Sequence, residues 1–126
     1  MEKATFQDMI ARKMQKEQDK HKTKEIEVKS IGKVLVFDKP SDDLVLNCIE
    51  EIGDGTNIRK TLEAYKKLIY HTCALLQSIE LQEKLEIIDP YDTVNAVFDL
   101  ADILQIGEDL TDFVGFGTVA EEIKNS

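Results

Sequence analysis

The clearest pattern of hydrophobic and polar positions lies in residues 56–76, where apolar side chains recur at spacings of three, four and seven residues. At about 100° per residue these side chains fall on one side of a helix, whereas Lys60, Lys67 and His71 lie on the other side. The pattern predicts a long amphipathic helix that packs one stripe against a hydrophobic core. The residues of this stripe are Ile58, Leu62, Tyr65, Ile69, Cys73 and Leu76.

A shorter amphipathic helix is predicted at the start of the chain. Thr5 and Asp8 have the spacing of a capping box, in which a hydroxyl and an acid three residues later cap the start of a helix. Residues 15–24 contain no apolar side chain, which predicts a solvated extension or charged linker. Alternatively, the helix is a bait that docks on another chain, and its apolar residues are then candidates for partner binding. These residues are Phe6, Met9, Ile10 and Met14.

The period of the pattern changes from helical to alternating between Glu25 and Phe37. Ile26 and Val28 alternate with charged residues, and a run of β-branched and aromatic residues follows at 34–37. Strands prefer such residues, and Gly32 supplies the positive φ that a tight turn requires. The segment therefore predicts a β-hairpin that rests one face on helices, because an isolated hairpin is marginally stable in water.

Two more helices are indicated by their starts and ends. Ser41, followed by two acids, predicts a helix start, and Gly53 predicts the end of that helix after Ile52. Ser78 favours a break after the long helix and the start of a separate short helix.

The last third of the chain begins with a helix start at Asp89 and Pro90. The helix predicted to follow, over residues 93–104, is apolar around most of its circumference, so it is either central or has two neighbours. We expect it to pack near Leu68, and we expect Gly107 to end it. The apolar residues of this wide surface are Val94, Val97, Phe98, Leu100, Ala101, Ile103 and Leu104, and the narrow polar strip is Asn95, Asp99 and Asp102.

A chain of 126 residues has the size of one domain. The predicted fold class is α+β and mainly α: a compact helical domain in which one N-terminal β-hairpin packs on about four to five helices. We divide the chain into an N-terminal amphipathic helix with its charged linker (1–24), a single globular domain (25–114) and a flexible C-terminal tail (115–126), with a last short helix before the tail.

The charge is divided unevenly along the chain, whose net charge is −9. Residues 1–40 contain ten Lys and Arg and seven Asp and Glu, whereas residues 41–126 contain six and eighteen. An acidic body repels phosphates, so nucleic acid is not an expected partner. No apolar run reaches the roughly 20 residues of a membrane span, and no signal peptide pattern is present. We therefore expect a cytoplasmic protein without a membrane partner.

The sequence contains no arrangement of residues that is typical of a catalytic or metal site. The paired acids lie at helix starts or on polar faces, and Cys48 and Cys73 occupy apolar helix positions typical of buried thiols. Nothing in the sequence places Ser30, Ser41 or Ser78 beside His71. We therefore assign no catalytic, cofactor-binding or metal-binding residue. Tyr70, next to His71, and Phe98, on the wide helix, join the N-terminal residues as candidates for partner binding.

Several segments together resemble a known family of small proteins. They are the hairpin, the Pro-Ser-Asp-Asp helix start at 40–43, Leu-Glu-Ala-Tyr-Lys-Lys-Leu-Ile-Tyr at 62–70, the Leu-Gln segment at 76–82 and Asp-Pro-Tyr-Asp at 89–92. In these segments and in their order, the chain is similar to tail assembly chaperones from phages and prophages of Gram-positive bacteria.

The resemblance implies a non-enzymatic protein with no cofactor. Such a chaperone acts in the cytoplasm of the bacterial host, keeps the tape measure protein soluble during tail assembly and is absent from the mature virion. The tail tube protein and self-association are further candidate interactions. Two alternatives stay open: an acidic regulatory protein-protein interaction module of a phage or prophage, and a small enzyme.

Overall fold

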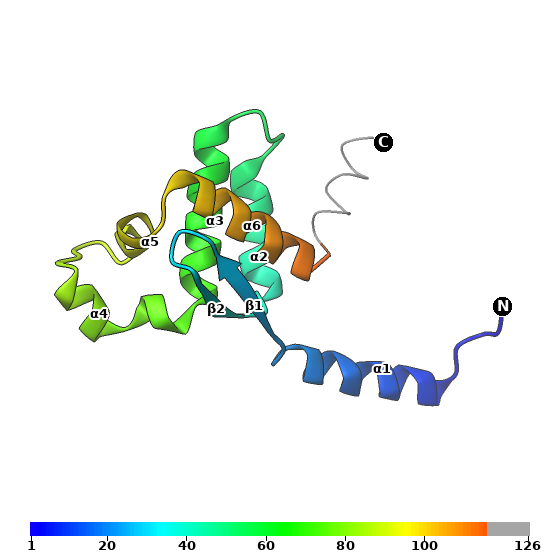
Figure 1. Ribbon diagram of the computed structural model, residues 1–126. Coiled ribbons are helices and arrows are strands. Elements are labelled where there is room, and N and C mark those ends of the chain that lie inside the picture. The colour runs from blue at the N-terminus through cyan, green and yellow to red at the C-terminus, as the bar shows by residue number, and fades with distance from the viewer. Residues whose placement is uncertain (116–126) are drawn as a thin grey trace.

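The computed structural model describes residues 1–115 and confirms the predicted α+β, mainly α fold class (Figure 1). One β-hairpin follows the first helix, and the remaining helices follow the hairpin. The elements are α1 (Phe6–Asp19), β1 (Thr23–Val28), β2 (Lys33–Asp38), α2 (Asp42–Ile52), α3 (Ile58–Thr72), the 3-10 helix η1 (Ala74–Gln77), α4 (Ile79–Lys84), α5 (Asp92–Val97) and α6 (Leu100–Phe113).

The predicted hairpin is confirmed. β1 and β2 pair antiparallel with Ile26 opposite Leu35, and Gly32 takes a φ of +71° in the turn. Alternation along the strands buries Ile26, Val28 and Phe37 on the inner face, where β1 packs on α6 and β2 contacts α3. The hairpin therefore gains its stability from the helices beneath it.

Helix α3 is the centre of the body, because α2, α5, α6, η1 and β2 all pack against it. The side chain of Asn57 caps its first turn by accepting from the backbone N–H groups of Arg59 and Lys60 at 3.1 and 3.3 Å. Together with both strands and the later helices, α3 builds one core. Its buried apolar residues are Ile26, Val28, Phe37, Cys48, Ala64, Leu68, Ile69, Cys73, Leu76, Val94, Phe98, Ile103, Ile106 and Leu110.

The predicted stripe of α3 is partly wrong in position and in length. Ala64 and Leu68 are fully buried, whereas Ile58 at the start of the helix is exposed. The helix ends at Thr72, because Cys73 is extended, and the Thr72 hydroxyl donates to the carbonyl of Leu68 at 2.8 Å. Such a side-chain bond competes with the helical backbone.

The helix predicted over residues 93–104 is in fact two helices. Phe98 and Asp99 are extended, and Asp99 forms a capping box with Asp102: each side chain accepts from the other's backbone N–H, at 2.9 and 3.1 Å. Both short helices pack against α3, and α6 also packs on β1. The change of direction between them buries Val94, Phe98 and Ile103, while Leu100 stays exposed. Asp89 caps only a turn, since its side chain accepts from Tyr91 N–H and α5 begins at Asp92.

Gly107 does not end a helix but lies buried inside α6. The ring of Tyr65 from α3 packs over it, and a Cβ at this position would overlap that ring. Glycine is therefore required for the close approach of α3 and α6, a role unrelated to helix termination. The last short helix expected before the tail is the end of α6, which runs to Phe113, and residues 116–126 of the predicted tail lie outside the described residues.

The helices at 42–52 and after Ser78 are confirmed. Ser41 and Ser78 each cap their helix by accepting from a backbone N–H at 3.2 Å, from Leu44 and Leu81 respectively. Gly53, with a φ of +62°, follows the end of α2.

Candidate partner-binding surfaces

Helix α1, which we call the arm, projects away from the body (Figure 1). None of its residues is buried: Phe6 is 76% exposed, Met9 57%, Ile10 42% and Met14 57%. The helix continues beyond Met14 to Asp19, so half of the segment expected to be a linker is helical. The arm is thus an amphipathic helix whose apolar stripe has no partner among residues 1–115.

Local interactions explain why an unburied arm is helical. Thr5 and Asp8 form the predicted capping box, in which Thr5 N–H donates to the Asp8 carboxylate at 2.8 Å. Near the other end, the amide of Gln15 donates to Asp19 at 2.9 Å and Lys13 pairs with Glu17 at 3.6 Å. Each such pair contributes only about 0.2–0.5 kcal/mol, so the capping box is the main local support of the arm.

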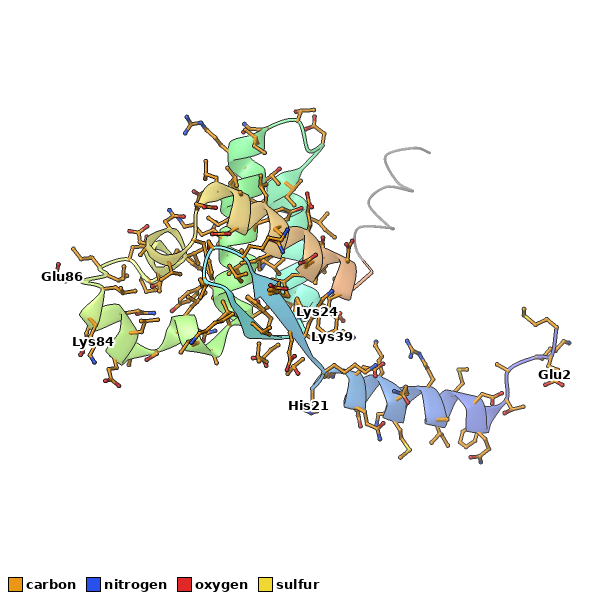
Figure 2. All side chains as sticks on the ribbon, viewed as in Figure 1. Glu2, His21, Lys24, Lys39, Lys84 and Glu86 are labelled. Atoms are coloured by element: carbon orange, nitrogen blue, oxygen red, sulfur yellow. The ribbon has the colours of Figure 1, made fainter. Side chains whose placement is uncertain are left out.

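The connection between the arm and the hairpin is short and hydrogen-bonded. Three residues separate α1 from β1, and Lys22 accepts from Lys39 N–H at 3.0 Å while its own N–H donates to Asp19 at 3.2 Å. The Lys22 side chain also pairs with Asp19 at 3.0 Å. Figure 2 shows His21 at this junction, with the arm extending from it in a direction that leads away from the helices. The arm cannot fold back on its own body while these bonds persist.

A second exposed apolar segment lies in η1, α4 and the turn after α4, residues 74–89, which we call the lobe. Ile79 is 73% exposed and Ile88 is 98% exposed, and no residue of α4 is buried. The sequence predicts a short helix after Ser78 but does not show which of its apolar residues point outward. The signal was the helical position of Ile79, which lies opposite the half-buried Leu81.

Phe98 is not a surface residue, so its assignment as a partner-binding candidate is wrong. Its side chain is 4% exposed and belongs to the core, because it lies in the extended link between α5 and α6 and turns inward.

Tyr70 is half-buried and is engaged in contacts within the body. Its ring makes edge-to-face contacts with His71 and Tyr91, both with ring centroids 5.3 Å apart. Gln82 donates to the Tyr70 hydroxyl at 3.2 Å, and Gln77 donates to its carbonyl at 2.9 Å. Tyr70 therefore joins α3 to the lobe. These contacts within the chain explain its position, so no contact with another protein is needed to explain it.

The outer face of the hairpin carries a small apolar patch. Val34 and Val36 are both about half exposed, and they face Glu27 and Glu25 across the pair of strands. With a charged strand beside it, the patch is narrower than the stripe of the arm.

The serines considered as nucleophiles all have structural roles. Ser30 donates to the buried Asp102 carboxylate at 2.7 Å, which ties the hairpin turn to α6, while Ser41 and Ser78 cap helices. Ser41 and His71 do line one shallow hollow between α2 and α3. However, His71 is bonded to the Tyr91 hydroxyl at 2.8 Å, and no hydrogen bond links it to Ser41. The nucleophile and base pair of a hydrolase is therefore not formed there.

Both cysteines are buried and free. Burial raises the pKa of Cys48 to about 11 and also raises the pKa of Cys73. Reactive thiols have lowered pKa values, so these two thiols have the character of core residues.

Within residues 1–115, no three His, Cys, Asp or Glu side chains are grouped so that they could hold a metal ion. In the same part of the chain, no helix has the length and apolar character needed to cross a membrane.

Comparison with protein-family models, with curated proteins and with solved structures finds no match to this chain.

Proposed function

We propose that this chain is a non-enzymatic phage tail assembly chaperone that holds the tape measure protein in solution. It would act in the cytoplasm of the bacterial host and leave before the virion is complete. The tape measure protein is the proposed client, and the tail tube protein is a second candidate partner. The proposal joins the family resemblance in the sequence to one structural observation, the uncovered arm.

The arm supports this proposal because its form suits a helical client. A helix that presents apolar side chains at positions i, i+3, i+4 and i+8 can pack along a second helix or into a groove between helices. Four large apolar side chains on one unburied helix exceed what a helix of a monomeric body normally leaves in water. A tape measure protein, long and rich in helices, offers many equivalent stripes for such a contact.

The charge of the body supports the same role. Residues 25–126 contain nine Lys and Arg and twenty-one Asp and Glu, whereas the arm and its junction, residues 1–24, contain seven and four. A strongly acidic body keeps a complex dispersed by repulsion between its copies. The arm would bind the client while the body provides solubility.

The test is co-expression with the product of the neighbouring tape measure gene, measured as the fraction of that product in the soluble lysate. We expect this protein to raise the soluble fraction several-fold and the double variant Met9→Asp/Ile10→Asp to abolish the gain. Leu46→Asp/Ile58→Asp makes the same change of two charges at similarly exposed positions of the body, so it is the matched control and should keep the gain. A client that is equally soluble without this protein would refute the proposal.

The acidic body also suits the alternative, a regulatory module that occupies a basic protein of the host or phage. Salt distinguishes the two functions. At physiological ionic strength, interactions between exposed charges are screened over about 8–10 Å, and higher salt shortens this distance. An apolar stripe retains its partner at high salt. A pull-down that survives about 1 M salt, where the screening length is only about 3 Å, favours the chaperone.

A further inference from the structure

We propose that, in the absence of a client, the arm of one copy docks on the lobe of another copy. Each of the two surfaces carries four exposed large apolar side chains, Phe6, Met9, Ile10 and Met14 in the arm and Leu75, Ile79, Leu85 and Ile88 in the lobe. The proposal concerns the protein alone, and it holds whether or not the client is a tape measure protein.

The apolar stripe of the arm is bordered by basic side chains. At about 100° per residue, Lys13, Lys16 and Lys20 lie within about 100° of the centre of the stripe, while Asp8 and Asp19 lie on the opposite side of the helix. Glu17 lies on the side of the stripe and pairs with Lys13 at 3.6 Å. Asp8 and Asp19 are also occupied within the arm, by Thr5 and by Lys22 and Gln15. Because Glu17 offsets Lys13, the net positive charge that borders the stripe comes from Lys16 and Lys20.

The lobe has the complementary character. Residues 74–89 contain four acids and one lysine. On α4, Glu83 lies about 40° from the outward Ile79, and Glu80, which pairs with Lys84 at 3.5 Å, lies about 100° from it. A surface of exposed isoleucine bordered by carboxylates fits a stripe of methionine and isoleucine bordered by lysines, and opposite charges favour this orientation over others.

The contact must form between copies. Figure 2 shows Glu2 at the free end of the arm and Lys84 and Glu86 in the lobe, on opposite sides of the molecule. The hydrogen-bonded junction at Lys22 keeps the arm pointing outward. An arm and a lobe on opposite sides make a head-to-tail contact between two different surfaces, which can extend to further copies.

Pairing of two arms is the less favourable arrangement. The arm together with its flanking residues, 1–24, contains seven Lys and Arg and four Asp and Glu, and the apolar repeat stops at Met14, which is short of the three to four heptads typical of a stable coiled coil. Two arms would bring together like charges, whereas the lobe offers opposite ones.

Light scattering coupled to size-exclusion chromatography tests the proposal at low salt over about 10–500 μM, since a contact of this small size is weak. We expect a mass above the monomer value of 14.3 kDa that rises with concentration and falls when salt is added. A monomer at every concentration would overturn the proposal.

Two variants make the test specific. Met9→Asp/Ile10→Asp should disable the arm and Ile79→Asp/Ile88→Asp the lobe, and each variant alone should be monomeric. Mixed in equal amounts, they retain one intact arm and one intact lobe, so we expect a dimer of about twice 14.3 kDa and nothing larger. Circular dichroism checks that each variant remains folded. A lobe variant that still self-associates, or a mixture that stays monomeric, would overturn the arm-to-lobe contact.

If the arm cannot tolerate acids at positions 9 and 10, a charge reversal provides a second route. Lys13→Glu/Lys16→Glu/Lys20→Glu keeps good helix formers and the apolar stripe, and it should abolish association at low salt. Glu80→Lys/Glu83→Lys in the other copy should restore association. Failure of the paired reversal to restore any mass above the monomer would count against the proposal.

Discussion

Helices α1 and α3 are amphipathic and nearly equal in length, 14 and 15 residues, yet they have opposite roles. Five other elements pack against α3, which has four buried residues, whereas α1 has none. Both have capped first turns and polar sides with similar side chains. The difference shows that periodicity predicts which side of a helix is apolar, while the neighbours decide whether that side is core or binding surface.

The largest expected difference between the two helices is in the free energy of unfolding when a charge is placed on the apolar side of each. Ile69 is fully buried on α3, so Ile69→Asp should cost more than about 4 kcal/mol and unfold the body, because an unpaired carboxylate is buried. Met9→Asp on α1 should change the free energy of unfolding by less than about 0.5 kcal/mol.

Thermal unfolding followed by circular dichroism measures both variants. Lys67→Ala is the control on the polar side of α3, where the lysine pairs with Glu51 at 3.0 Å in a partly exposed bridge, and it should cost less than about 1 kcal/mol. A soluble, fully helical Ile69→Asp protein would show that this side of α3 is not the buried one.

A smaller effect tests how closely α3 is covered. Gly107→Ala adds a methyl group where the Tyr65 ring packs on α6, which should cost about 1–3 kcal/mol for overpacking, less about 1 kcal/mol gained in helix propensity. Urea denaturation gives the difference. Ala11→Gly, on the uncovered arm, is the matched exchange of the same two residues and should leave the unfolding of the body unchanged. A more stable Gly107→Ala protein would mean that the ring moves aside without cost.

The smallest expected effect concerns acid, to which the two caps respond differently. Hydrogen bonds from Thr5, that of its backbone N–H above all, lower the pKa of Asp8 below its ordinary value of 3.8. A lowered pKa means that the cap stabilises α1 above pH 3.8 and is lost as the pH falls through the lowered pKa. Asn57 caps α3 and does not titrate.

Amide chemical shifts between pH 6 and about pH 3 should therefore show the first turn of α1 fraying while the first turn of α3 is unchanged. Asp8→Asn removes the titration and serves as the control. Equal fraying of both helices would indicate that acid acts on the whole body and not through the cap.

Local signals in the sequence were enough for much of the fold. Residues with specific backbone or capping roles, such as Gly32, Ser41 and Ser78, placed the hairpin turn and two helix starts correctly. The capping box of Thr5 and Asp8 did the same for the arm. Each of these signals acts within three or four residues, so the sequence alone contains it.

The failures came from contacts between distant residues. The buried bond from Ser30 to Asp102 joins residues far apart in the chain, so the sequence places Asp102 on a polar strip. The capping box of Asp99 and Asp102 is a local exception, because a spacing of three residues fits a polar strip as well as a cap. The sequence predicts that Gly107 ends a helix, but glycine is required at this position because the ring of Tyr65 packs over it. Likewise, Phe98 was placed on the surface because no single helix could bury the whole circumference.

For the candidate surfaces, the sequence identified the arm residues and missed the lobe. The sequence of a short helix does not show which of its apolar residues point outward, whereas the structure shows that Ile79 is 73% exposed and Leu81 is half-buried.

The two buried cysteines have a practical consequence. Because burial raises the pKa of both native thiols, they should be slow to react with maleimides near neutral pH. A cysteine introduced at Ala11, on the exposed arm and away from its stripe, would then be the site of attachment for a dye or spin label. Distances from the arm could be followed in the otherwise unaltered chain, both in the free protein and on a client.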